Sequence, residues 1–268
     1  LKQFGSAPQV QDLYDIQMKR PAAAAQASKK GLVKKPAIKG KAPLRPAVMS
    51  PGLRGYQRSY RGGGTADMHF ELLKAAAGLT RARTVLYPGC HRHLTMSLVF
   101  PDVQYIDSDA KVADAFAEPA CSGYVERNKI YKEEAVLQFT QADFTKQLPK
   151  EVTLPTRGCG FDMLVSFSSG LVSPYCSRYI RPGGFLLVSD AHADARTAFL
   201  MKEWSLRAVW LDGKFKTDRS VLDRCFRVAA TGKPISAAQV KESVAVGAVS
   251  KRSFKLDLEP MFYLFAHL

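Results

Sequence analysis

The sequence predicts an α/β fold, a mostly parallel sheet with helices on both faces, preceded by a long basic extension. Three observations predict it. Along residues 65–268, strand-like apolar segments alternate with segments of helical period. A tight turn that carries Gly89 follows the first of these strands. Residues 1–64 are rich in Pro, Ala, Gly and Lys and have few large apolar side chains, so they cannot build a core of their own.

The first half of the predicted domain alternates helices and strands in a regular way. Apolar residues at helical spacing mark its helices, with Gly78 and Pro119 as stops. In chain order, the expected elements are a helix over 65–79, a strand over 83–88, a short helix over 93–100, a strand over 103–109, a helix over 110–120 and a strand over 135–144.

The second half continues the same alternation. Its expected elements are a strand over 161–170, a helix over 171–180, and strands over 181–190, 204–211 and 261–268. Between the last two strands, Ser236 and Gln239 can form a capping box that opens a short helix. Strands alternating with helices indicate a parallel sheet whose two faces are both covered.

Positive charge is concentrated at the beginning of the chain. The formal net charge of the 268 residues is +15. Residues 1–64 hold thirteen Lys and Arg against two Asp, whereas residues 65–268 hold 26 Lys and Arg against 22 Asp and Glu. The charge pattern therefore divides the chain into a basic extension, 1–64, and a nearly balanced domain, 65–268. So basic an extension favours a polyanionic partner.

We expect the extension to bind nucleic acid, with its cations neutralising phosphates and its tyrosines stacking on bases. A flexible linker and a tail for an acidic protein partner are the alternatives. The candidate nucleic-acid-binding residues are Lys29, Lys30, Lys34, Lys35, Lys39, Lys41, Arg45, Arg54, Tyr56, Arg58, Tyr60 and Arg61.

The cysteines and the hydropathy pattern limit the function classes further. The five cysteines are scattered without a Cys-x-x-Cys pair, which indicates reduced thiols and predicts no metal site. No apolar run approaches ~18 residues, so no membrane span is expected. The sequence begins at Leu1, which would fit the removal of an organellar leader.

Two stretches carry a resemblance to a known family. They are VLYPGCHRHLTMSLVFPDVQYIDSD, residues 85–109, and FDMLVSFSSGLVSPYCSRYIRPGGFLLVSDAHADA, residues 161–195. In spacing and strand order they resemble the class I S-adenosylmethionine-dependent methyltransferases, whose fold is Rossmann-like. The resemblance implies S-adenosylmethionine as a possible cofactor. It also implies that Gly89 makes the tight turn, that Asp107 accepts the ribose hydroxyls, and that Asp143 meets the adenine amino group.

The sequence departs from that family at several positions. His91 and His93 stand where further glycines would be expected, and Tyr87 stands near the acid that would hold the methionine amino group. The fourth strand ends in SFSSG and lacks the motif of amino-methylating enzymes. The pattern therefore predicts a degenerate cofactor loop, no catalytic residue and no bound cofactor. Asp190, His192 and Asp194 cap a helix or supply a general base.

Three functions fit these observations. The first is an rRNA-binding structural component or assembly factor of an organellar ribosome, placed in the mitochondrion beside other ribosomal proteins. Long basic tails on compact domains are typical of ribosomal proteins. The second is an active S-adenosylmethionine-dependent methyltransferase of RNA or protein. The third is a chromatin-type protein of the nucleus or plastid, since DNA and RNA backbones both suit such a tail.

Overall fold

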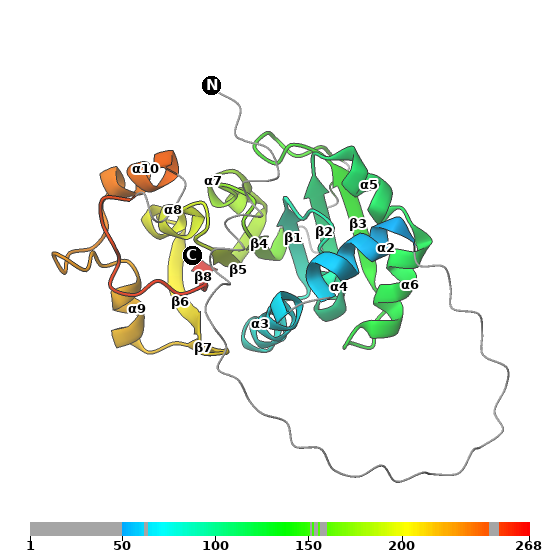
Figure 1. The fold of residues 1–268 in the computed structure, drawn as a ribbon, viewed down its shortest axis with the longest axis horizontal. Helices are drawn as coiled ribbons and strands as arrows, with labels where there is room; N and C mark the ends of the chain where they lie inside the picture. The colour runs from blue at the N-terminus through cyan, green and yellow to red at the C-terminus, as the bar shows by residue number, and fades with distance from the viewer. Residues whose placement is uncertain (1–49, 62–63, 151, 153–154, 156–159, 247–251) are drawn as a thin grey trace, which may run out of the picture. The chain divides into compact units, whose positions relative to one another are not determined.

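One mixed sheet of eight strands organises the domain (Figure 1). The computed structural model describes residues 50–61, 64–150, 152, 155, 160–246 and 252–268. Within these ranges, side chains are described for residues 50–60 and from His69 onward. The strand order is β3-β2-β1-β4-β5-β8-β6-β7. The strands are β1 (Thr84–Pro88), β2 (Asp102–Asp107), β3 (Val136–Gln141), β4 (Phe161–Ser166), β5 (Ile180–Ser189), β6 (Trp204–Leu211), β7 (Lys214–Lys216) and β8 (Phe262–His267).

The sheet confirms the predicted fold class. Strands β1 to β5 pair in parallel, and β8 enters antiparallel between β5 and β6. This is the mostly parallel, Rossmann-like arrangement that the sequence predicts for a methyltransferase-like fold. The short strand β7 forms a hairpin with β6 that was not predicted, although Asp212-Gly213 is a strong hairpin signal.

Helices cover both faces, because alternate residues of each strand point to opposite sides. Val85 and Tyr87 belong to one apolar cluster, whereas Leu86 between them belongs to another. The first cluster contains residues of α3 (Gly64–Thr80), α4 (Thr95–Val99) and α5 (Ala110–Phe116). The second contains residues of α7 (Ser173–Cys176), α8 (Asp194–Leu200), α9 (Arg219–Cys225) and α10 (Ala237–Val246). A 3-10 turn, η2 (Ser177–Tyr179), joins α7 to β5.

Most predicted helices are confirmed, with two corrections. The capping box of Ser236 and Gln239 opens α10, as predicted. Gly78 does not stop α3, which continues to Thr80. Pro119 does not merely end a helix: it is the first residue of an additional helix, α6 (Pro119–Asn128). A proline lacks the N–H that the first helical turn leaves unpaired, so it begins a helix as readily as it ends one.

The compact unit begins at Ser50, whereas the sequence places the boundary after residue 64. Helix α2 (Pro51–Tyr56) continues into a single π-helical turn, η1 (Gln57–Arg61). Leu53 and Tyr56 are buried, and the Gly52 N–H donates to both carboxylate oxygens of Glu118, at 3.0 and 2.9 Å. This segment is therefore part of the domain. Within the described residues, no helix is long and apolar enough to cross a membrane.

Candidate functional site

The carboxyl ends of β1, β2 and β3 bring the predicted cofactor residues together. Gly89 directly follows β1, Asp107 ends β2, and Asp143 follows β3. The Gly89 N–H donates to the Ile106 carbonyl oxygen at 2.7 Å, and the Ala142 N–H donates to the Asp107 carbonyl oxygen at 2.9 Å. The strand order reverses between β1 and β4, and the crevice beside that reversal is where open α/β sheets bind their ligands.

Ser169, just after β4, bridges this crevice. Its Oγ donates to the Gly89 carbonyl oxygen at 2.9 Å. A Cβ placed on Gly89 would lie only 2.4 Å from the Ser169 Cβ. Gly89 also has a φ of +63°, which favours glycine. The glycine therefore makes the predicted tight turn, and the space above it is filled by the protein's own serine.

The Asp107 carboxylate binds the backbone of the loops around it. Oδ2 accepts from the His91 N–H at 2.8 Å, and Oδ1 accepts from the Asp109 N–H at 3.0 Å. His91 adopts a φ of +48°, so a histidine takes the left-handed conformation that a glycine would adopt more easily. Each carboxylate oxygen keeps a further lone pair, so Asp107 retains the capacity to accept a ribose hydroxyl.

Asp143 stabilises a turn. Its Oδ1 accepts from the Thr145 hydroxyl at 2.6 Å and from the Thr145 N–H at 3.0 Å. These hydrogen bonds, with Lys146 nearby, hold the pKa of the Asp143 carboxyl below its ordinary value. The geometry is that of an Asx turn, which an Asp forms without any ligand.

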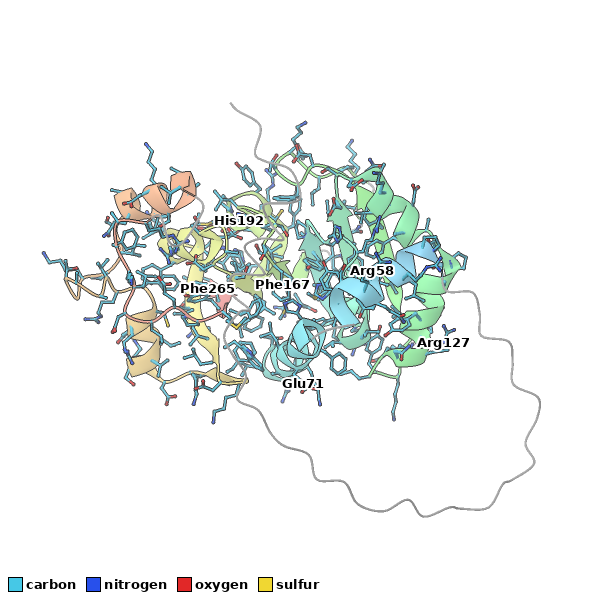
Figure 2. The ribbon with its side chains drawn as sticks, viewed as in Figure 1. Arg58, Glu71, Arg127, Phe167, His192 and Phe265 are labelled. Carbon is cyan, nitrogen blue, oxygen red and sulfur yellow. The ribbon has the colours of Figure 1, made fainter. Side chains whose placement is uncertain are left out.

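Aromatic and imidazole rings fill the region beside the loop. We call His69, Tyr87, His93, Phe167 and Tyr60 the histidine cluster. Tyr87 Oη lies 3.0 Å from His93 Nδ1, and the Tyr60 ring stacks on His93 with 4.2 Å between centroids. His69 stacks on the buried Phe167, labelled in Figure 2, with 5.3 Å between centroids. Both histidines are 1% exposed.

Burial keeps the two deep imidazoles neutral. It lowers the pKa of His69 to about 4, and it lowers the pKa of His93 well below its ordinary value. At neutral pH the cluster therefore presents no charge. His93 therefore packs inside the domain. His91 is more exposed, and its Nδ1 lies 3.5 Å from Tyr60 Oη.

The residues present fit the ribose half of S-adenosylmethionine better than its methionine half. The ribose half keeps Asp107. The methionine half has Tyr87 near the position where the family resemblance would place an acid, and its phenol is engaged with a neutral imidazole. A cationic amino group would find no counter-charge from Tyr87 or His93. Ser169 also covers the glycine on which the cofactor would rest.

The predicted nucleic-acid-binding residues divide into four groups. Arg54 and Arg58 are exposed on the α2–η1 segment, and Arg58 is labelled in Figure 2. Tyr56 is 0% exposed, and its hydroxyl lies 2.9 Å from Thr95 Oγ1, so the prediction that it stacks on bases is wrong. Tyr60 is half-buried and stacks on His93. Outside the residues whose side chains are described lie Lys29, Lys30, Lys34, Lys35, Lys39, Lys41, Arg45 and Arg61.

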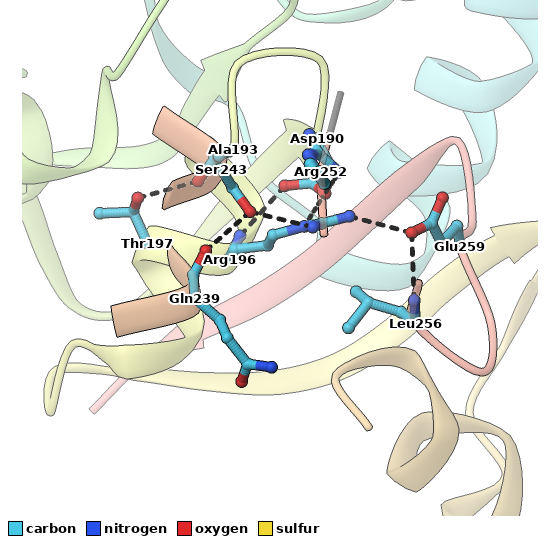
Figure 3. Close-up of polar contacts among 9 residues, drawn as sticks. All are labelled: Asp190, Ala193, Arg196, Thr197, Gln239, Ser243, Arg252, Leu256 and Glu259. Atoms are coloured by element: carbon cyan, nitrogen blue, oxygen red, sulfur yellow. Dashed lines mark hydrogen bonds and ion pairs between the residues drawn. The ribbon is translucent and has the colours of Figure 1, made fainter. Parts of the chain in front are cut away.

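The acids after β5 have structural partners. Asp190 Oδ1 accepts from the Arg196 N–H in the first turn of α8, at 3.2 Å, which agrees with the capping alternative. Its Oδ2 pairs with Arg196 Nε at 2.6 Å (Figure 3). Asp194 is buried and accepts from the hydroxyls of Ser166 and Ser173, at 2.6 and 2.7 Å.

Arg196 holds three segments of the chain together. Besides Asp190, its guanidinium binds Ser243 Oγ of α10 at 3.2 Å and Glu259 Oε1 at 3.1 Å. His192 Nε2 lies 3.1 Å from the Ser168 carbonyl oxygen, so its polar contact is to backbone and not to a carboxylate. The network around Asp190 therefore stabilises the packing of these segments, and its geometry is not that of a general-base site.

Sequence reasoning missed Ser169, Tyr60 as a ring partner of His93, and His69. The only signal for Ser169 is the run of small polar residues in SFSSG, because such residues permit close approach of two loops. His69 lies in the helix before β1, where nothing in the sequence connects it to the loop. Among the residues that the structure describes, no group of three His, Cys, Asp or Glu could hold a metal ion.

Comparison with solved structures finds proteins whose chain path is similar to that of this chain and whose sequence identity to it is low. The O-methyltransferase TomG of Streptomyces achromogenes is 12% identical with a TM-score of 0.40, over 62% of this chain and 86% of that one. A methyltransferase of Geobacter sulfurreducens is 13% identical with a TM-score of 0.37, over 62% and 86%. TrmN of Thermus thermophilus is 16% identical with a TM-score of 0.39, over 74% and 48%. No protein-family model matches the sequence, and no curated protein matches it.

Proposed function

We propose that this chain is an rRNA-binding scaffold, a structural component or assembly factor of a mitochondrial ribosome, built on a methyltransferase-like domain that binds no cofactor. One observation carries the second half of the proposal. Ser169 Oγ is hydrogen-bonded to the Gly89 carbonyl oxygen across the crevice in which a cofactor would lie. Binding would have to break this contact and displace the serine from the glycine.

The basic extension supports the first half of the proposal. Thirteen of the chain's 39 Lys and Arg fall in residues 1–64. Two of them, Arg54 and Arg58, are exposed on the domain itself, where the extension joins it. Cations distributed along an extended segment neutralise phosphates and release counterions, without any need for a cofactor. Neighbouring ribosomal proteins are the other expected partners.

Calorimetry with S-adenosylmethionine tests the scaffold. We expect no binding by the full chain at cofactor concentrations up to ~1 mM, a limit that corresponds to about 4 kcal/mol of binding free energy. Ser169→Gly is the matched variant, since it removes the bridging hydroxyl and side chain. Micromolar binding by the unaltered chain, lost in Asp107→Ala, would contradict the scaffold.

Salt titration tests the RNA half. Deletion should stop at residue 49, because Ser50–Tyr60 is part of the compact domain. Binding of the full chain to an rRNA fragment should weaken steeply with salt, and deleting residues 1–49 should remove most of that slope. An equal slope for the shortened chain would refute the assignment to the extension.

Quantitative mass spectrometry across a sucrose gradient of mitochondrial lysate tests the assembly. One copy per particle in one ribosomal subunit is the result expected for a structural component. Trace amounts on immature particles indicate an assembly factor. Free protein at the top of the gradient would contradict both.

An active RNA or protein methyltransferase is the second candidate. Two features favour it: Gly89 still makes the tight turn, and Asp107 still ends β2 with free acceptor capacity. The calorimetric experiment distinguishes the two candidates directly, because an enzyme of this class must bind its methyl donor.

A further inference from the structure

A cavity of about 360 Å³ lies between β6, α8 and α9. Strand β6 is antiparallel to β8, which is antiparallel to β5, so β6 runs in the same direction as β5. Trp204, the first residue of β6, is therefore at the amino edge of the sheet. The cavity is thus at the edge of the sheet opposite Gly89 and Asp107. It is therefore separate from the site at which a cofactor would bind.

Part of the cavity wall is apolar, beside a larger polar share, and its apolar side chains are held in place by their neighbours. Phe199 stacks on Phe226 with 4.3 Å between ring centroids. Trp204 is 5% exposed, and its indole N–H donates to Ser177 Oγ at 2.9 Å. Leu222 is buried beside them. Because these side chains are fixed by their neighbours, a ligand would lose little free energy to ordering them.

The mouth of the cavity carries two guanidinium groups. Arg227 Nε donates to the Asp223 carbonyl oxygen at 3.3 Å, and Nη1 donates to the Gly232 carbonyl oxygen at 3.1 Å. These bonds fix the guanidinium and leave most of its five N–H donors unused. Arg219 pairs with the Asp223 carboxylate at 2.8 Å and is otherwise exposed. Two cations and one anion give the mouth a net positive charge.

From these features we propose that the cavity binds a small amphipathic organic anion, an apolar chain or ring that ends in a carboxylate. The apolar part would lie against Phe199, Trp204 and Leu222, and the carboxylate would meet Arg227. The volume is at the lower end of the range of small-molecule pockets, about 300–1,000 Å³. A planar guanidinium held in place is suited to bidentate binding of a carboxylate.

Two-dimensional ¹H–¹⁵N NMR of the full chain tests the proposal. The protein has only two tryptophans, Trp204 and Trp210, so it has two indole N–H resonances, which Trp210→Phe assigns. Trp204 lines the cavity, and Trp210 instead contacts Phe215. The probes are octanoate and octanol, which share a chain and differ in charge. We expect octanoate to shift the Trp204 resonance saturably, and octanol to bind at least tenfold more weakly.

Matched variants separate the two parts of the site. Arg227→Met should weaken octanoate binding at least tenfold and leave octanol binding nearly unchanged. Leu206→Phe, which enlarges a cavity-lining side chain on the same face of β6 as Trp204, should weaken the binding of both. Arg224→Met is the control, since Arg224 is an arginine three residues before Arg227, does not line the cavity and pairs with Asp257.

Three results would overturn the proposal. They are the absence of a saturable shift of Trp204 with octanoate, equal affinity for octanoate and octanol, and a loss of affinity in Arg224→Met equal to that in Arg227→Met. An unchanged spread of backbone resonances in each variant shows that the fold is intact.

Discussion

Substitutions of Tyr56 test whether the segment Ser50–Tyr60 belongs to the core of the domain or to an RNA-binding surface. Its side chain is fully buried, its hydroxyl lies 2.9 Å from Thr95 Oγ1, and its ring meets Tyr124 edge to face with 5.7 Å between centroids. Tyr56→Ala should lower the free energy of unfolding by about 3–5 kcal/mol, the range for large aromatic side chains removed from a core. Tyr56→Phe keeps the ring and removes only the hydroxyl, which should cost about 1–2 kcal/mol because Thr95 loses its buried partner.

The assay is urea unfolding at neutral pH, followed by tryptophan fluorescence and circular dichroism, with RNA affinity measured on the same samples. Arg58→Ala is the control: it should change stability by less than about 0.5 kcal/mol and lower the salt slope of RNA binding by about 1. The reasoning would be refuted if Tyr56→Phe left the unfolding midpoint unchanged while weakening RNA binding. That outcome would return Tyr56 to the nucleic-acid surface.

Three further predictions concern buried polar groups. Arg196→Met should destabilise the domain by about 3–5 kcal/mol in urea unfolding, since it removes the guanidinium that lies 2.6 Å from the largely buried Asp190 carboxylate. Arg224→Met, which breaks an exposed pair, should cost less than about 1 kcal/mol. Because burial lowers the pKa of His69 to about 4, the unfolded chain binds the proton more tightly, and stability should fall by up to about 1.4 kcal/mol per pH unit between pH 6 and 4. His69→Gln should flatten that decline, and an unchanged slope would exclude His69 as its cause. Burial raises the pKa of four thiols, so peptide mass spectrometry should show slow alkylation by iodoacetamide at pH 8 in the folded protein and fast alkylation in urea. These thiols are Cys90, Cys121, Cys176 and Cys225.

Local signals in the sequence determined the elements and the edge at which the candidate residues meet. Strand β6 has the predicted bounds, and the capping box of Ser236 and Gln239 forms, because both depend on residues close together in the chain. Gly89 and Asp107 could be placed side by side from sequence, since parallel strands bring their carboxyl ends to one edge. The fold class followed from the same alternation.

Only the tertiary structure decided which of those residues are accessible. Tyr56 and its partner Thr95 are 39 residues apart, and Ser169 is 80 residues from the glycine that it covers. A tyrosine in a basic, glycine-rich segment has the same local pattern whether it is buried or exposed. Its burial depends on where another helix packs, and the contact of Ser169 with Gly89 depends on the conformation of the loop after a different strand. Both are consequences of long-range packing, which no local pattern in the sequence encodes.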